Sequence, residues 1–179
     1  MMSNSTAAAT PEPLRDADPR LLRFLAAWRA ARAGAPMPRR RAFDPMTAPD
    51  LLPWIWLCAY DPAADDFVYR LAGEEVNAAW GRSLRGAALR DLLGPEDHPT
   101  VRRRWAEILE GPNLHYGLTR ERLSALETQS AERLLAPLAD DAGLPAYILG
   151  VSLYRVAASD PGRPPLTAED YVRLPVAAL

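Results

Sequence analysis

The amino-acid sequence predicts an α+β fold in which an antiparallel sheet carries helices on one of its faces. Three observations lead to this class: strand-like segments lie on both sides of a helical stretch (73–110), two strands are apolar on both sides, and an amphipathic helix precedes them. The chain has 179 residues, of which 49% are apolar and 25% are charged. This length and composition are typical of one globular domain with short extensions.

The amphipathic helix is expected to begin at Asp18-Pro19, because Asp can cap free backbone amides and Pro is pre-organised for the first helical position. Gly34 and the proline after it end the helix near Ala33. Apolar residues at helical spacing give it a stripe, made of Leu21, Phe24, Leu25 and Trp28. We expect this stripe to cover a face of the sheet, either within its own chain or across a homodimer interface.

The flanks of this helix are polar or proline-rich. Residues 1–17 are interpreted as a disordered leader, and 18–53 as a helical cap and connector. Five prolines between residues 35 and 53 exclude a long regular element, so one short helical turn is expected near Pro49–Leu52. The run Arg39-Arg40-Arg41 in the connector is interpreted as a solvated loop.

Most strand-like segments come in pairs. Trp54–Tyr60 and Phe67–Ala72 flank the turn 61–66, and Glu132–Leu138 and Ala146–Val156 flank the turn 139–143. The carboxylate pairs Asp65-Asp66 and Asp140-Asp141 are interpreted as turn formers. A further strand is expected over Asn113–Arg120, with its end left open because residues 120–129 hold good helix formers.

Helices are expected between the strand pairs. Gly73–Trp80 and Ala87–Leu93 are short, and Pro95–Glu110 is longer with one apolar face. The chain after Ser159 is proline-rich, and one helical turn is expected over Leu166–Val172.

Strand 146–156 is apolar on both sides, with Tyr147, Leu149, Val151 and Leu153 on one and Ile148, Tyr154 and Val156 on the other. Trp54–Tyr60 has the same character. Strands of this kind belong in the middle of a sheet that is covered on both faces. The short helices cover one face, and the amphipathic helix is the candidate for the other.

Several local phrases carry a resemblance to a known family. They are Phe43-Asp44-Pro45, Asp50-Leu51-Leu52-Pro53-Trp54-Ile55-Trp56-Leu57, Tyr69-Arg70-Leu71-Ala72-Gly73-Glu74-Glu75-Val76, Gly81-Arg82-Ser83-Leu84-Arg85-Gly86 and Glu132-Arg133-Leu134-Leu135-Ala136-Pro137-Leu138-Ala139-Asp140-Asp141. In this order, over residues 20–156, they resemble the PAS domain, in particular a bacterial family usually found in proteobacteria.

The resemblance implies a five-stranded antiparallel sheet of spatial order 2-1-5-4-3, a core over 54–156 and a tail over 157–179. It also implies a helical N-terminal cap and a pocket between the sheet and the short helices. Domains of this family act as sensory or regulatory modules and are often dimeric through the cap. In that spatial order the strands that come first and last in the sequence are central, which agrees with their two apolar sides.

Composition excludes several kinds of function. The net charge of −2 provides no field for nucleic acid or an anionic membrane. One cysteine excludes an internal disulfide and a cysteine metal cluster. No Ser or Cys lies in a nucleophile-elbow sequence, and Gly81–Gly86 lacks the glycine spacing of a phosphate-cradling loop. We therefore expect no enzyme activity.

Cofactor binding has few candidate residues. In some relatives a histidine near the long helix holds haem, but His98 is interpreted as an exposed residue of the first turn. His115 could face the pocket, yet one imidazole without a partner is a poor metal site. Flavin photochemistry needs a cysteine in a short helix, whereas Cys58 lies in a strand among apolar neighbours and is expected to be an inert thiol of raised pKa. Haem and flavin are therefore not expected.

A non-covalent pocket remains possible under the resemblance. Its expected lining is Tyr69, Leu71, Val76, Trp80, Leu89, Leu92, Trp105, Ile108, Tyr116 and Leu134. Aromatic and aliphatic walls suit a small apolar ligand, but the same side chains could simply fill the core. Arg70, on the strand face opposite Tyr69, is expected to pair with a carboxylate under the cap.

The preferred hypothesis is a cytoplasmic, non-enzymatic sensory or regulatory module that acts by dimerisation and by contact with a separate signalling protein. The alternative is a sensor with a small molecule in the apolar pocket. The N-terminus resembles no secretory signal, and no window is long and apolar enough to span a membrane.

Overall fold

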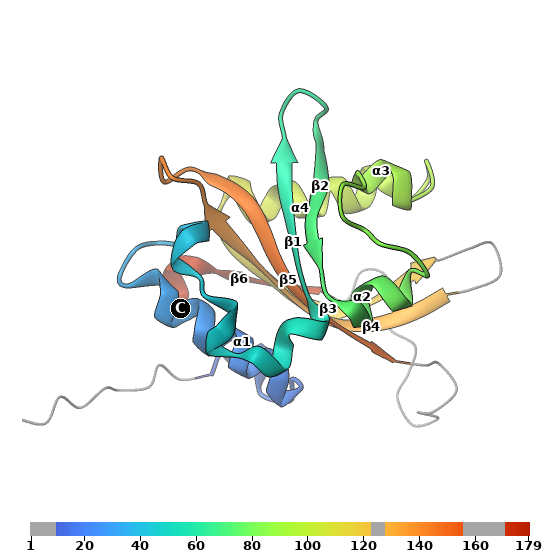
Figure 1. The fold of residues 1–179 in the computed structure, drawn as a ribbon. Coiled ribbons are helices and arrows are strands. Elements are labelled where there is room, and N and C mark those ends of the chain that lie inside the picture. The colour runs from blue at the N-terminus through green and yellow to red at the C-terminus, as the bar shows by residue number, and fades with distance from the viewer. Residues whose placement is uncertain (1–9, 123–127, 156–170) are drawn as a thin grey trace, which may run out of the picture.

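In the computed structural model, which describes residues 10–122, 128–155 and 171–179, six strands form one antiparallel sheet of order β2-β1-β5-β4-β3-β6 (Figure 1). The strands are β1 (Ile55–Asp61), β2 (Asp66–Ala72), β3 (Asn113–Arg122), β4 (Thr128–Ala139), β5 (Pro145–Arg155) and β6 (Tyr171–Pro175). The predicted order 2-1-5-4-3 is confirmed. An additional strand, β6, lies beyond β3.

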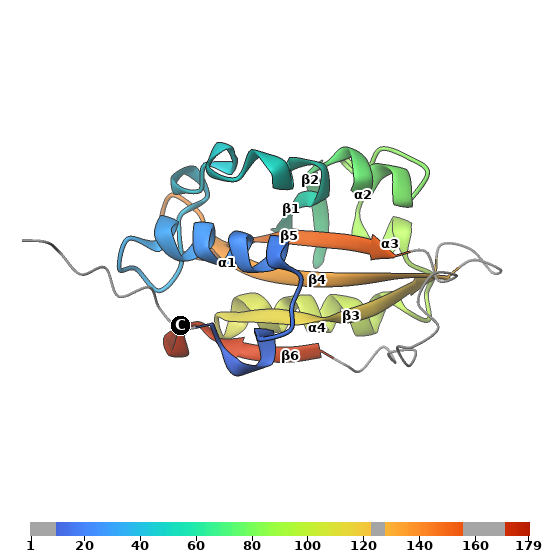
Figure 2. The same cartoon turned by 90° about the horizontal axis from the view of Figure 1, so that it is seen from below.

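Helices lie on both sides of the sheet. They are α1 (Pro19–Arg32), α2 (Glu74–Ala79), α3 (Leu89–Leu92) and α4 (His98–Glu110). Figure 2 shows α1 in front of the sheet and α4 behind it. No helix in the described part of the chain has the length and apolar character needed to cross a bilayer.

Helix α1 seals one face of the sheet. The Asp18 carboxylate accepts a hydrogen bond from the backbone amide of Arg20, which caps the helix as predicted. The predicted stripe is buried at 0–2% exposure, and it consists of Leu21, Phe24, Leu25 and Trp28. At roughly 1.5–3 kcal/mol for each large apolar side chain, this burial is ample reason for α1 to dock. The indole of Trp28 also donates to the carbonyl of Pro137 at 3.0 Å.

We call the apolar layer under α1 the cap-side core. Besides the stripe it includes Leu14, Leu51, Ile55, Leu57, Leu134, Leu149, Val151 and Leu153. Leu14 and Ala17 are buried in it, so the prediction that the leader is disordered as far as residue 17 is wrong for its last residues. Residues 1–9 lie outside the described residues.

The opposite layer, the helix-side core, lies between the sheet and α2, α3 and α4. It consists of Trp56, Cys58, Phe67, Tyr69, Val76, Leu84, Leu89, Trp105, Ile108, Leu109, Leu135 and Ile148. Alternate residues of β1 and β5 enter the two cores, so both strands are buried on both sides. The prediction that these two strands are central is confirmed.

Trp56 and Gly150 form a close contact between these central strands. They are register partners, and a Cβ placed on Gly150 would lie 2.3 Å from the indole of Trp56. The indole therefore lies directly against the β5 backbone, and its Nε1 donates to Ser152 Oγ at 2.8 Å. Any larger residue at 150 must displace the tryptophan.

Strand β2 contains a bulge at Arg70. Leu57 pairs with Leu71 and Cys58 pairs with Tyr69, so Arg70 has no partner on β1. An extra residue in one strand shifts the alternation of the side chains that follow it. Tyr69 therefore faces the helix-side core, whereas Leu71 lies beside Leu57 on the cap side.

Several predicted boundaries change. Strand β6 lies in the segment that was predicted to be a tail. Tyr171 and Val172 belong to this strand and not to the helical turn expected over Leu166–Val172. The rest of that expected turn, 166–170, lies outside the described residues. The connector holds 3-10 turns at 40–42, 45–47 and 49–54, more than the one predicted. Residues 120–122 belong to β3 and 128–129 to β4, which settles the described part of the open segment as strand.

Replacing Gly150 with Ala is expected to lower the free energy of unfolding by about 1–3 kcal/mol, because the added methyl group overpacks the site of Trp56. Chemical denaturation measures this change. Gly94→Ala is the matched control, since its Cβ meets nothing within 4 Å, and its effect should stay within about 0.5 kcal/mol. Equal stabilities for the two variants would contradict the packing argument.

Candidate functional site

The space between sheet and helices holds most of the residues predicted to line a pocket. Tyr69, Val76, Leu89, Trp105 and Ile108 belong to the helix-side core, and Trp80 and Leu92 pack against it. The structure thus brings these residues together on one side of the sheet.

An aromatic group occupies the middle of this space. The Trp105 indole, carried by α4, stacks on Trp56 with ring centroids 5.0 Å apart, and it meets Phe67 at 5.4 Å and Tyr69 at 6.2 Å. Each of these four side chains is at most 6% exposed. Such contacts contribute packing energy beyond burial alone, so the rings hold α4 to the sheet.

A buried carboxylate joins β2 to the helices. Asp66 is 0% exposed. Its carboxylate accepts hydrogen bonds from the backbone amide of Arg90 at 3.1 Å and from the Arg90 Nε at 2.8 Å. The Oδ1 atom of Asp66 also lies 3.0 Å from His98 Nε2. Burial by itself would raise the pKa of Asp66, but the hydrogen bonds from Arg90 and His98 hold it below its ordinary value. The predictions of a turn role for Asp66 and of an exposed His98 are therefore wrong, since sequence distance concealed their contact.

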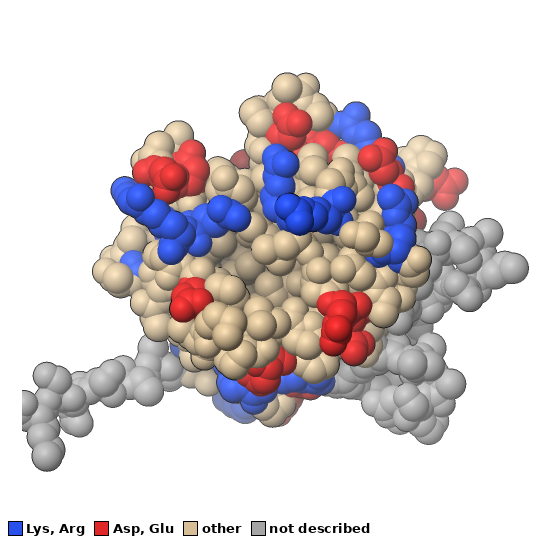
Figure 3. All heavy atoms as spheres, viewed as in Figure 1, with Lys and Arg blue, Asp and Glu red and all other residues tan. Residues whose placement is uncertain are grey.

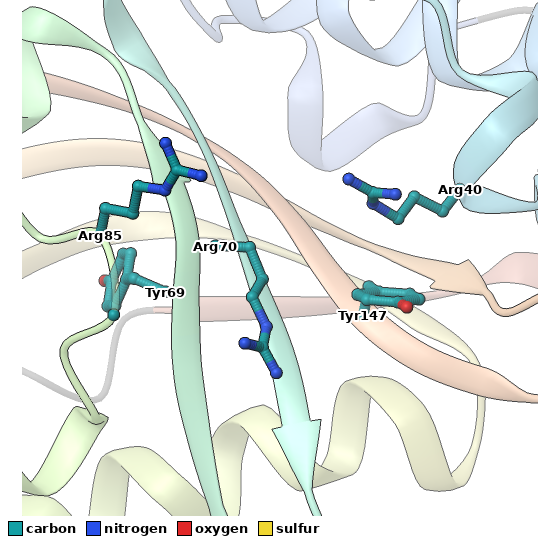
Figure 4. Close-up of a pocket in the computed structure, with 6 residues that line it drawn as sticks. Arg40, Tyr69, Arg70, Arg85 and Tyr147 are labelled. Atoms are coloured by element: carbon teal, nitrogen blue, oxygen red, sulfur yellow. The ribbon is translucent and has the colours of Figure 1, made fainter.

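The surface of the molecule has a second candidate site, which we call the arginine groove. It is an open hollow of about 460 Å³ lined by Arg40, Tyr69, Arg70, Arg85, Gly86 and Tyr147. In Figure 3 basic side chains border the upper side of a hollow on the face that carries the β1–β2 hairpin, and acidic side chains lie farther down the same face. Figure 4 shows the labelled residues extending from several different elements.

Arg85 is positioned by a loop that pairs with the edge of β2. Gly86 donates its amide to the carbonyl of Tyr69 at 2.8 Å, and Tyr69 donates to the carbonyl of Ala87 at 3.0 Å. Gly86 has φ of +84°, a conformation that L side chains rarely adopt. Asn77 holds the same loop by accepting from the amide of Leu84 at 2.9 Å.

Arg40 is positioned by the connector. The amide of Ala139 donates a hydrogen bond to the carbonyl of Pro38 at 2.9 Å, and Arg39 forms an isolated parallel β-bridge with Ala139. These backbone contacts hold the connector to the end of β4. The Arg40 guanidinium lies over the Tyr147 ring of β5, 5.7 Å from its centroid. This distance is within the range of a cation–π contact.

Arg70 reaches the groove through the bulge in β2, and it is exposed. Among the described residues it makes no ion pair with a carboxylate, so the expected pairing under the cap is wrong. A buried carboxylate does lie there, but it is Glu132, which accepts from the Asp18 amide and from the Tyr116 hydroxyl, each at 3.0 Å.

Comparison with family models gives one decisive match. The model described as PAS domain matches residues 17–153. This range begins just before α1 and ends inside β5, two residues before the end of that strand. The chain belongs to the PAS domain family. The predicted resemblance is therefore confirmed, and with it the general role of a sensory signalling module.

The solved structures that are similar to this chain are distant from it in sequence. A Rhodobacter sphaeroides LOV protein is 16% identical with a TM-score of 0.47, and the match covers 60% of this chain and 61% of that one. A light-oxygen-voltage domain studied with a flavin analogue is 20% identical with a TM-score of 0.47, over 63% and 84% of the chains. A sensory box histidine kinase/response regulator from Burkholderia thailandensis is 13% identical with a TM-score of 0.41, over 62% and 84%. No curated protein matches the chain.

Three residues predicted to line the PAS pocket lie elsewhere. Leu71 is 40% exposed on the cap side, because the Arg70 bulge reverses the alternation after Tyr69. Leu134 belongs to the cap-side core, and Tyr116, its register partner, packs against the same core. Alternation tells which residues share a face but not which face, and here that choice was wrong.

The remaining sequence candidates are both buried. Cys58 is completely buried in β1, and burial raises the pKa of its thiol well above the ordinary value, as predicted. His115 is 4% exposed and lies on the side of β3 that faces α4. Its ring packs against the ring of Tyr171 in β6, with the two ring centroids 4.9 Å apart. Burial, followed by the charges of Arg173 and Arg104, lowers the pKa of His115 to about 4.

The burial of His115 predicts an acid-sensitive stability. Its folded pKa of about 4 lies below the ordinary 6.5, so the unfolded chain binds the extra proton between these values. The free energy of unfolding should therefore fall as pH drops from about 6.5 to about 4, by up to about 3 kcal/mol from this residue.

Denaturation curves at several pH values test this expectation. His115→Phe keeps a ring against Tyr171 but cannot bind a proton, so its stability should fall less over the same pH range. Above pH 7, the difference in the free energy of unfolding between the wild type and His115→Phe should be constant. Parallel curves over the whole range would show that His115 is not responsible.

Proposed function

We propose that this PAS domain is a non-enzymatic regulatory module in bacterial signalling that acts by contact with a separate signalling protein. Family membership supports the sensory role. The observation that supports the finer proposal is the aromatic group Trp56, Phe67, Tyr69 and Trp105, whose rings pack against one another between the sheet and α4. Because these rings pack closely, we propose that the signal passes through contacts on the surface of the domain.

The residues with cofactor chemistry support the same proposal. Cys58 is inside β1 with a raised pKa, which is the opposite of a reactive thiolate. The Nε2 of His98 is engaged by the buried carboxylate of Asp66 and is directed toward β2. Neither residue is placed to hold a haem or a flavin in the helix-side core.

The alternative is a sensor with a small apolar ligand in the core. A ligand that took the place of Trp105 would have to break its stack on Trp56, at the cost of contacts that bury both rings almost completely. Truncating a buried tryptophan typically costs about 3–5 kcal/mol, which gives the scale of the rearrangement. The closed arrangement therefore favours regulation by surface contacts.

Freshly purified protein should show no visible absorbance band, and its native mass should equal that of the polypeptide. The measurement is an absorbance spectrum together with native mass spectrometry of the full chain. A flavin or haem spectrum, or a bound apolar molecule retained at stoichiometric amount, would overturn the proposal and support the alternative.

A homodimer remains part of the proposal, but the predicted interface residues cannot form it as expected. Leu21, Phe24, Leu25 and Trp28 are buried against their own sheet, so this stripe needs no second chain. A dimer through α1 would have to use the outer side of the helix, where Ala26 and Ala30 are exposed one turn apart.

The oligomeric state is measured by light scattering of the full chain at several concentrations. If the dimer forms through α1, the wild type should have twice the chain mass and the double variant A26E/A30E should be monomeric. Ala142→Glu in the β4–β5 turn is the control, since Ala142 is exposed. A monomeric wild type at all concentrations would exclude the homodimer.

A further inference from the structure

We propose that the arginine groove binds a small molecule with at least two phosphate groups, such as a diphosphate. This goes beyond the proposed function, which assigns no ligand to the domain. The proposal rests on the charges in the groove, on how they are held, and on the size of the hollow.

The charges of the groove are uncompensated. Its lining holds three guanidinium groups and no carboxylate. Six other described arginines make ion pairs with acidic side chains, and these pairs are Arg20 with Asp18, Arg23 with Asp50, Arg41 with Asp141, Arg90 with Asp66, Arg102 with Asp65 and Arg173 with Glu107. Arg40, Arg70 and Arg85 make no such pair within the parts of the chain that the structure describes. Like charges around one hollow repel one another, and a bound anion relieves that repulsion.

The chemistry of these side chains selects oxyanions. A guanidinium presents a planar fork of N–H donors that matches two oxygens of one phosphate or carboxylate. Arg40 comes from the connector, Arg70 from β2 and Arg85 from the loop after α2, so the three forks belong to separate elements and extend in different directions (Figure 4). A ligand with two or more anionic groups can engage forks on different elements at once.

The groove is held in shape before any ligand arrives. The β2 bulge places Arg70, the pairing of Gly86 and Ala87 with Tyr69 fixes the backbone beside Arg85, and Tyr147 supports the guanidinium of Arg40. A fixed backbone loses less conformational entropy on binding than a flexible loop does. Bulges are also common next to binding sites, where they redirect a side chain.

The dimensions and surroundings favour a small molecule over a polyanion. A volume of about 460 Å³ is within the usual range for small-molecule sites. Nucleic acid binding depends on an extended basic surface, whereas this chain has a net charge of −2 and acidic side chains on the same face (Figure 3). The attraction is therefore local to the hollow.

Isothermal titration of the full chain with pyrophosphate, ADP, orthophosphate and citrate tests the proposal. Pyrophosphate and ADP should bind at least about tenfold more tightly than orthophosphate, because they present two phosphates to separated forks. Citrate at equal affinity would show that carboxylates serve as well and would overturn the assignment to phosphate.

Substitutions locate the binding. Each of Arg40→Ala, Arg70→Ala and Arg85→Ala should weaken pyrophosphate binding about tenfold, as expected for a lost charged hydrogen bond. The matched control is Arg103→Ala, which removes an exposed charge from α4 outside the groove and should change the affinity less than twofold. Arg70→Lys keeps the charge but not the fork, and should give an intermediate loss. Circular dichroism and thermal unfolding confirm that each variant is folded.

Three results would overturn the proposal: no binding of pyrophosphate or ADP at low salt, an equal loss of affinity in R103A, or binding of an acidic peptide at the groove without binding of either diphosphate. None of these results bears on the absorbance or native mass of the purified protein. Failure of the groove and failure of the proposed function are thus distinguishable.

Discussion

The burial of β1 and β5 on both faces is the constraint on which the structure depends. Their side chains alternate between the cap-side core and the helix-side core, so α1 must cover one face and α4 the other. Gly150 makes this possible at the centre, because its missing side chain lets Trp56 lie against β5 and reach Ser152. Removing either covering layer would expose large apolar side chains to water.

The two covering layers also bury the large aromatic side chains of the domain. Trp56 stacks on Trp105, and the two indoles pack with Phe67 and Tyr69 in the layer where a ligand pocket was predicted. The cap side is filled by the α1 stripe in the same way. The arginine groove lies at the accessible surface near the edge of β2.

Much of the fold follows from local pattern. Asp18-Pro19 and the apolar spacing after it predict α1, and the two-sided apolarity of two strands predicts their central place. The candidate site was less predictable, although each of its arginines has an interpretation from the sequence. Arg40 was interpreted as part of a solvated run, Arg85 as part of a glycine segment without a phosphate spacing, and Arg70 as the partner of a carboxylate. Their common hollow depends on contacts between segments far apart in the chain.

The sequence by itself determined the fold class, the central strands, the helical cap and the burial of Cys58, because each depends on periodicity, capping or an apolar neighbourhood. Only the tertiary structure decided which face each side chain meets. The bulge at Arg70 sends Leu71 to the cap side, and Asp66 meets Arg90 and His98 from more than 20 residues away. Strand β6 joins the sheet from beyond the predicted core. Such contacts depend on register and long-range packing, which alternation within one segment does not encode.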